Sequence, residues 1–185
     1  MSYDISLIDK VIHKPCSMSK QKIRGGTVPA EIDPATGLLV QSSQTECHIN
    51  ITYNYSPYYE IFIDDVDYGI QGLYGMTAKE SIPVLEKMIE DISKRYQDEN
   101  HNWKTKTGTR THYYYKDGTE CNDIITAYLK ERAELNKVEE KYQISEGDTS
   151  NYWEATAANA LIPLTDMLNM ALYNINNKDA VWEGD

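Results

Sequence analysis

The sequence predicts an α+β fold in which a small antiparallel sheet packs against two to three helices, with an inserted hairpin-plus-helix segment. Three patterns support this prediction: strict alternation in HINITYNY at residues 48–55, helical spacing of apolar residues over 77–96, and a second apolar helical pattern over 156–174. A period of two indicates a strand with one buried face, and 3–4 spacing indicates an amphipathic helix. A chain of 185 residues is expected to form one domain, residues 1–185.

The first half of the chain is expected to supply the strands. Residues 1–21 alternate weakly and predict a short strand or helix followed by a loop. The segment 23–46 is rich in Gly, Pro, Ser and Thr, which indicates loops and a hairpin with its turn at residues 33–37. A strand then runs over 46–55, and Ser56-Pro57 ends it.

Two helices carry clear start signals. Thr77 and Glu80 form a capping box, in which each side chain accepts a backbone N–H that the helix leaves unpaired. Apolar residues then recur at spacings of 3, 4, 3 and 4, which predicts one core-facing stripe; they are Ile82, Leu85, Ile89, Ile92 and Tyr96. Thr156 is expected to cap the last helix in the same way.

The segment 98–147 is predicted to be an insertion that packs onto the main body or onto another subunit. Asp117-Gly118 is a strong turn signal after a polar stretch. Residues 120–143 predict a further helix with charged remaining faces, because four apolar positions lie one heptad apart: Cys121, Tyr128, Leu135 and Tyr142.

The charge excludes several partners. The chain has 18 Lys and Arg against 29 Asp and Glu, a net charge of −11, and residues 1–30 carry +3 against −14 for the remainder. Phosphate affinity comes mainly from Lys and Arg, so we expect no direct nucleic-acid binding and no binding to anionic lipid. An acidic decoy that mimics DNA stays open.

Cysteine usage and hydropathy predict a cytoplasmic protein without a membrane segment. Three cysteines at wide spacing, with no C-x-x-C, suit a reducing compartment. The N-terminus lacks a cationic region that leads into an apolar run, and no stretch approaches the roughly 20 apolar residues of a membrane helix.

Motifs for metal binding and for nucleophilic catalysis are absent. The histidines form no i, i+4 pair, the cysteines fit no zinc pattern, and the stretch DDVDYGIQGLYG lacks the ligands of a calcium loop. There is no G-x-S-x-G, and Cys47 and His48 would point to opposite faces of a strand. We therefore expect no metal or cofactor and assign no catalytic residue, while paired carboxylates remain possible.

Three features predict a pocket for a small anionic ligand: the basic segment around Arg24, the polar strand face, and the helix start at Thr77, which a G-x-x-G-x-x-G stretch precedes. Asn50, Thr52 and Asn54 suit a base or sugar edge, or alternatively satisfy loop backbone. The glycines could equally serve a tight turn. The candidate ligand-binding residues are Arg24, His48, Asn50, Thr52, Asn54, Tyr55, Tyr74, Thr77 and Trp153.

Several stretches together resemble a family of small, acidic proteins of uncharacterised function from bacteriophages and prophages: RGGT, NITYNYSPYY, GIQGLYGMTAKESIPVLEKMI, NYWEATAANA and VWEGD. The resemblance covers residues 22–26, 48–96 and 151–185. It brings no activity, and it implies a protein of the host cytoplasm that forms homo-oligomers and holds a host molecule.

These observations predict a non-enzymatic phage accessory protein that binds a nucleotide-like ligand and thereby sequesters a host immune signal. Two alternatives stay open. One is a protein-interaction module or acidic decoy that inhibits a host protein. The other is a hydrolase or transferase with an unrecognised carboxylate site.

Overall fold

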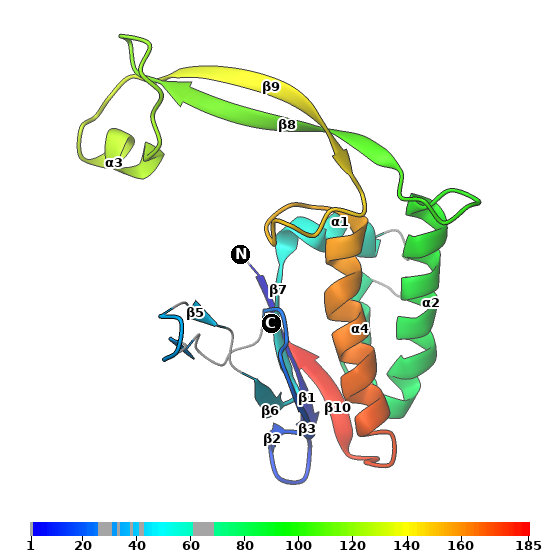
Figure 1. Cartoon of the computed structure of the whole chain (residues 1–185). Helices are drawn as coiled ribbons and strands as arrows, with labels where there is room; N and C mark the ends of the chain where they lie inside the picture. Colours follow the sequence, from blue (N-terminus) through cyan, green and yellow to red (C-terminus); the bar gives the residue numbers. More distant parts are fainter. Residues whose placement is uncertain (1, 26–30, 33, 38, 41–42, 61–68) are drawn as a thin grey trace. The chain divides into compact units, whose positions relative to one another are not determined.

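The computed structural model describes the chain apart from residues 1, 26–30, 33, 38, 41–42 and 61–68, and it confirms the α+β fold class (Figure 1). The chain divides into two compact units. Residues 1–103 with 147–185 form the first, here called the main unit, and residues 104–146 form the second, called the hairpin unit. The hairpin unit lies within residues 98–147, the range that the sequence predicts to be an insertion. That this range is inserted into a single domain stays a prediction.

The main sheet is built around its first strand. β10 (Ala180–Gly184) pairs antiparallel with one edge of β1 (Ser2–Asp9). On the other edge, β7 (His48–Thr52) pairs with the first half of β1, and β2 (Lys14–Pro15) pairs with its end. The first and last strands of the chain are therefore neighbours in one sheet.

Two smaller pairs of strands complete the N-terminal half. β3 (Ser17–Gln21) pairs with β6 (Gln44–Glu46) through an irregular register, and β4 (Glu31–Ile32) pairs with β5 (Leu39–Val40). The β4–β5 pair confirms the hairpin that the turn at 33–37 predicts. The first 21 residues contain three strands, where the sequence predicted one element followed by a loop.

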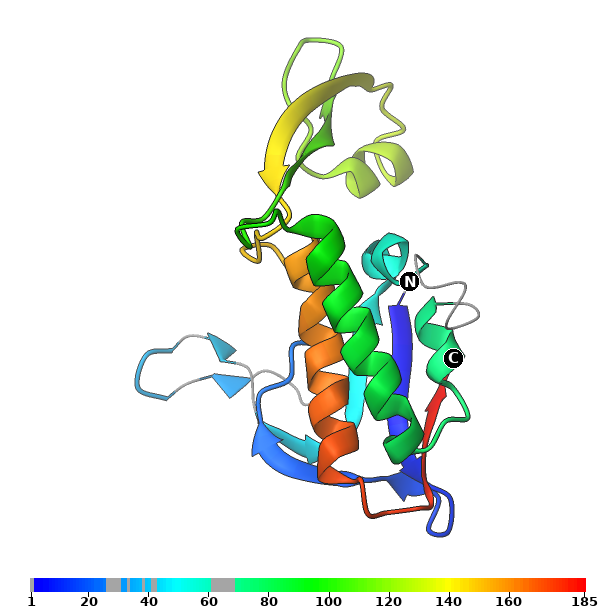
Figure 2. The same ribbon diagram turned by 90° about the vertical axis from the view of Figure 1, so that its right-hand side faces the viewer.

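Two long helices, α2 (Ala78–Tyr96) and α4 (Ala157–Tyr173), lie side by side over one face of the main sheet (Figures 1 and 2). Both predicted starts are confirmed. Thr77 accepts the backbone N–H of Glu80 while the Glu80 carboxylate accepts that of Thr77, and Thr156 accepts the backbone N–H of Asn159.

The core lies between this sheet face and the helices. Burial of each large apolar side chain contributes roughly 1.5–3 kcal/mol. The sheet supplies Ile5, Leu7, Ile49, Ile51 and Trp182, and the helices supply Leu85, Met88, Ile92, Leu164, Met167 and Met170. Trp182 is fully buried, and its indole N–H donates to the hydroxyl of Ser81 at 2.8 Å. This bond joins β10 to α2 inside the core.

The strand predicted over 46–55 is shorter in the structure. β7 ends at Thr52, residues Tyr53–Tyr55 form a 3-10 turn, and Ser56–Tyr59 form the short helix α1. The Thr52 hydroxyl accepts the backbone N–H of Asn54, which starts the turn. Pro57 stands in the first turn of α1, where its missing N–H costs nothing, so Ser56-Pro57 starts a helix here instead of closing a strand.

The hairpin unit corrects the helix predicted over 120–143. β8 (Thr105–Tyr114) pairs along its whole length with β9 (Asn136–Ser145), and helix occupies only α3 (Ile124–Leu129). Val138 and Tyr142 are four residues apart, a spacing that fits both a helix face and a strand face. The ring of Tyr142 lies over Gly108 on the opposite strand, at a position that any Cβ would overlap. The predicted turn at Asp117-Gly118 is present between β8 and α3.

We predict that Ser81→Ala destabilises the main unit by about 1–3 kcal/mol, because it leaves the buried indole N–H of Trp182 without an acceptor. In a Trp182→Phe background the same change is expected to cost about 1 kcal/mol or less, since no donor remains. Urea unfolding followed by far-UV circular dichroism measures both values. Equal costs in the two backgrounds would show that this hydrogen bond does not contribute.

We also predict that the hairpin unit loses stability as pH rises. His112 bonds Glu120 at 2.9 Å and Glu140 at 3.1 Å, and these hydrogen bonds raise the pKa of His112. The imidazolium therefore stabilises the folded unit fully below the unfolded pKa of about 6.5, and this contribution disappears as pH rises through the higher folded pKa.

Amide protection factors of β8 and β9 across this pH range measure the effect. They should decline with rising pH in the parent chain and stay level in His112→Gln. A parallel decline in both proteins would contradict the assignment to His112.

Candidate functional site

Side chains on the polar face of the main sheet form hydrogen bonds between β7 and β1. His48 Nδ1 lies 2.6 Å from the Ser6 hydroxyl. The Asn50 amide donates to the Ser2 hydroxyl at 2.8 Å and to the Asp4 carboxylate at 2.6 Å. These bonds follow from strand pairing, because Ser6 is opposite His48 and Asp4 is opposite Asn50. The side chains that the sequence suggested for a ligand are thus bonded to the neighbouring strand.

Carboxylates line the same face. β7 itself carries no acidic residue, but β1 places Asp4 beside Asn50, and β10 places Glu183 opposite Ser6. The Asp185 carboxylate accepts the backbone N–H of Asp4 at 3.0 Å. An anionic ligand on this face would meet like charges, which oppose binding. The charge of the face could not be read from β7 alone.

Ser6, His48 and Asp4 are the residue types that form the nucleophile, the base and the acid of a catalytic triad. His48 Nε2 lies 3.8 Å from Asp4 Oδ1 and has no hydrogen-bond partner among the described residues. Acyl transfer also needs free N–H donors for the developing oxyanion. Ser6 lies on the central strand of the sheet, paired with β7 on one side and β10 on the other, so its backbone surroundings offer no such donors.

Tyr152, in the loop before α4, organises a second cluster. The Arg24 guanidinium lies 5.0 Å from the centre of its ring. Trp153 and Tyr55 meet the ring edge-on, with centroids at 5.0 and 6.0 Å. The Tyr152 hydroxyl donates to the carbonyl of Asn50 at 3.1 Å, and the Tyr55 hydroxyl donates to the carbonyl of Tyr152. The Asn54 side-chain amide donates to the Trp153 carbonyl at 2.8 Å. We call Arg24, Asn54, Tyr55, Tyr152 and Trp153 the Tyr152 cluster.

Arg24 has neutral partners in this cluster. Its guanidinium donates to the Asn159 side-chain oxygen at 2.7 Å and to the Thr149 carbonyl at 3.2 Å. No carboxylate pairs with it within the described part of the chain. Burial is the main cause that raises the pKa of Tyr55 to about 12, and it also raises that of Tyr152. Both phenols stay neutral, so neither of them compensates the charge of Arg24.

Backbone geometry fixes Arg24 next to this cluster. The carbonyl of Gly25 accepts the backbone N–H of Asn50 at 2.7 Å. Gly25 has a φ of +83°, and a Cβ there would overlap the Asn50 carbonyl. Only glycine fits this close approach to β7.

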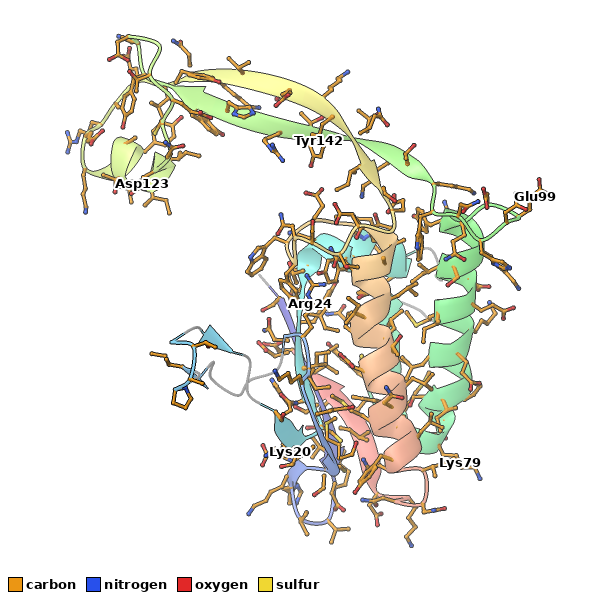
Figure 3. All side chains as sticks on the ribbon, viewed as in Figure 1. Lys20, Arg24, Lys79, Glu99, Asp123 and Tyr142 are labelled. Atoms are coloured by element: carbon orange, nitrogen blue, oxygen red, sulfur yellow. The ribbon has the colours of Figure 1, made fainter. Side chains whose placement is uncertain are left out.

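Thr77 and Tyr74 are not part of the Tyr152 cluster. Thr77 forms a bridge with Val181, and the Glu80 carboxylate already occupies its N–H at 2.8 Å. Figure 3 places Arg24 near the start of α4 and Lys79, next to Thr77, at the other end of the helix pair. A helix of 17 residues is about 25 Å long, so these two predicted parts of one pocket lie far apart.

Tyr74 packs its ring where a Cβ of Gly184 would stand. Its hydroxyl is buried and has no hydrogen-bond partner among the described residues, and burial raises its pKa to about 12. Thr52 is buried and caps the turn after β7. Neither residue presents a polar group to a surface ligand.

Sequence reasoning missed Tyr152 and Asn159, which hold the cluster together. Asn159 is buried, and its amide donates to the carbonyls of Asn151 and Glu154 at 2.8 and 2.9 Å. The available signal was the motif NYWEATAANA, in which an Asn follows the Thr156 cap by three residues. An interior Asn at such a place commonly satisfies loop backbone.

Three further ionisable groups among the described residues have raised pKa values. Burial raises the pKa of Cys16 to about 11 and that of Cys47 to about 12, which keeps both thiols protonated and poor nucleophiles. Burial also raises the pKa of Asp166 to about 6, but a raised pKa without a positioned partner does not define an acid–base site. No group of three or more His, Cys, Asp or Glu that could hold a metal ion occurs among the residues that the structure describes.

The hairpin unit exposes the large side chains of α3. Ile125 is 72% exposed and Leu129 76%, whereas Ala127 between them is fully buried. Successive helical residues are about 100° apart, so Ile125 and Leu129 both lie on the side opposite Ala127. Ile124 and Tyr128 are also exposed. We call these four residues, Ile124, Ile125, Tyr128 and Leu129, the α3 surface.

Comparisons of this chain with protein-family models, with curated proteins and with solved structures give no match. The resemblance to a phage family therefore stays a prediction. None of the helices in the described ranges has both the length and the apolar character needed to cross a membrane.

Proposed function

We propose that this protein acts by binding another protein through the α3 surface. The observation that carries the proposal is the orientation of α3, which buries its alanine and exposes two large aliphatic side chains. A helix that served only its own unit would place these residues the other way round. Burial of Ile125 and Leu129 would contribute about 1.5–3 kcal/mol each, and a partner surface can supply that burial.

The α3 surface is fixed and is not a frayed segment. The Asp123 carboxylate accepts the backbone N–H of Thr126 at 2.9 Å and caps the helix. After the helix, the backbone N–H of Ala133 donates to the carbonyl of Ala127 at 2.9 Å. A preorganised apolar surface loses less entropy on binding than a disordered one.

The hairpin itself favours a binding role. Within the described ranges β8 and β9 form a two-stranded sheet of their own, and an isolated pair of strands is marginally stable in water. Apolar contact with a partner would stabilise this unit. The proposal develops the alternative of a protein-interaction module, and it uses the apolar α3 surface in place of an acidic decoy surface.

Photo-crosslinking in the native cell tests the proposal. A benzophenone amino acid at Tyr128 should give discrete protein adducts, and the yield should fall at least tenfold when Ile125→Glu and Leu129→Glu are added, because charges replace the apolar contact. The matched control places the same amino acid at Ile32, an apolar residue of similar exposure (69%) in β4. Equal adducts from both positions, or adducts that ignore the two Glu changes, would overturn the proposal.

A second candidate function, the predicted binding of a nucleotide-like ligand, is favoured by Arg24. This guanidinium has only neutral partners among the described residues and lies on Tyr152, next to the exposed ring of Trp153. A phosphate on Arg24 and a base on Trp153 would use both groups. In a phage this site would serve to sequester a host signal molecule.

Titration of ¹⁵N-labelled protein with adenosine monophosphate tests this candidate. The indole N–H signal of Trp153 should shift and saturate with the nucleotide, and shift at least tenfold less at equal concentrations of adenosine, which lacks the phosphate. Trp182, fully buried, provides the internal control in the same spectra. No shift of the Trp153 signal, or equal shifts with both compounds, would remove this candidate.

A further inference from the structure

We infer that the partner of the α3 surface is a second copy of this chain, and that it binds at one end of the main unit. This inference rests on the proposed function and names its partner. The receiving surface, here called the end patch, consists of Val11, Ile12, Leu172, Tyr173 and Ile175.

The end patch combines the turn between β1 and β2 with the end of α4 and the residue Ile175 just after it. The backbone N–H of Lys10 donates to the carbonyl of Asp179 at 3.0 Å, and the amide of Asn177 donates to the Asp9 carboxylate at 3.0 Å. These bonds join the β1–β2 turn to the loop that follows α4, and the turn and the end of α4 both lie at the lower end of the main unit in Figures 1 and 2. Val11 is 70% exposed and Tyr173 60%, so large apolar side chains face solvent on both parts.

Charge permits a contact between these two surfaces, because the end patch region does not add to the repulsion that the rest of the acidic main unit would exert. The segment 115–135, which joins β8 to β9 and contains α3, has three Lys or Arg against five Asp or Glu, a net charge of −2. The segments 9–14 and 172–179 together have three Lys against two Asp, a net charge of +1. Glu183 pairs with Lys10, so with Glu183 included the region around the end patch has no net charge, on a main unit that carries ten basic and 21 acidic residues, a net of −11.

The same charges disfavour the simplest alternatives. Two α3 surfaces facing each other would bring together two segments of −2, and two main units would bring together two charges of −11. The hairpin unit has eight basic and eight acidic residues and is neutral, so it can approach the acidic main unit of another copy without net repulsion.

A contact between two different surfaces is heterologous. Each copy keeps one free α3 surface or one free end patch, so the association continues into a ring or a chain of copies. Four apolar side chains are far fewer than the roughly 20–30 residues on each side of a standard interface. We therefore expect weak association with a Kd on the order of micromolar.

Complementation between two blocked variants tests this inference with the full chain. One variant carries Ile125→Glu and Leu129→Glu and lacks the α3 surface. The other carries Val11→Glu and Tyr173→Glu and lacks the end patch. Ile32→Glu is the matched control, since it places the same charge at an equally exposed isoleucine outside both surfaces. Far-UV circular dichroism and thermal melting confirm that each variant is folded.

Sedimentation velocity gives the mass of each sample from about 1 μM to several hundred micromolar, a range that brackets the expected Kd. The parent chain and Ile32→Glu should rise more than twofold above the 21.2 kDa of one chain. Each blocked variant alone should stay at one chain. An equimolar mixture of the two should form a species of two chains and nothing larger, because only one productive contact remains.

Two results would overturn the inference: a parent chain that stays at one copy over the whole range, or a mixture of blocked variants that does not pair. Either result leaves the proposed function standing if Tyr128 still crosslinks to a different protein. Absence of specific adducts at Tyr128 would remove both.

Discussion

The orientation of α3 is the constraint on which the functional account depends. The hairpin unit has two strands and one short helix, and it has no third layer that could cover both sides of that helix. Ala127 takes the inner position, so Ile125 and Leu129 must face outward. Capping by Asp123 holds this arrangement in place. Covering an apolar surface that is held toward solvent lowers the free energy, and the proposed binding function rests on this gain.

In the main unit, the polar side chains suggested for a ligand site mostly bond to other parts of the same unit. On the polar face of its sheet, Asn50 and His48 bond to side chains of β1, next to the carboxylate of Asp4. In the Tyr152 cluster, Arg24 and Asn159 tie the loop before α4 to the rest of the unit. Much of what suggests a ligand pocket in the sequence thus stabilises tertiary structure. Among the described residues Arg24 has only neutral hydrogen-bond partners, and the proposed second candidate function uses this group.

Local signals predicted the helices well and the site only in part. Thr77 with Glu80, and Thr156 with its following apolar residues, define helix starts through contacts within one turn, and a sequence records such contacts directly. Residues 120–143 were predicted wrongly, because Val138 and Tyr142 fit a helix and a strand equally and only the pairing with β8 decides between them.

Long-range pairing explains the remaining differences. The sequence prediction placed Arg24 and Thr77 in one pocket, but they lie at opposite ends of the helix pair. It also omitted Tyr152, whose ring contacts Arg24, Tyr55 and Trp153. The acidic residues beside Asn50 come from neighbouring strands, so the alternation within β7 could not reveal them. The exposure of Ile125 likewise depends on which side of α3 the hairpin covers.

Hydrogen–deuterium exchange of the parent chain as a function of its own concentration tests the central claim most directly. If copies cover one another's α3 surfaces, peptides from residues 124–129 and from residues 10–13 and 172–175 gain protection together as concentration rises through the micromolar range, while peptides from α2 stay unchanged. Protection of residues 124–129 that is already complete at the lowest concentration, or that never develops at the highest, would contradict the account.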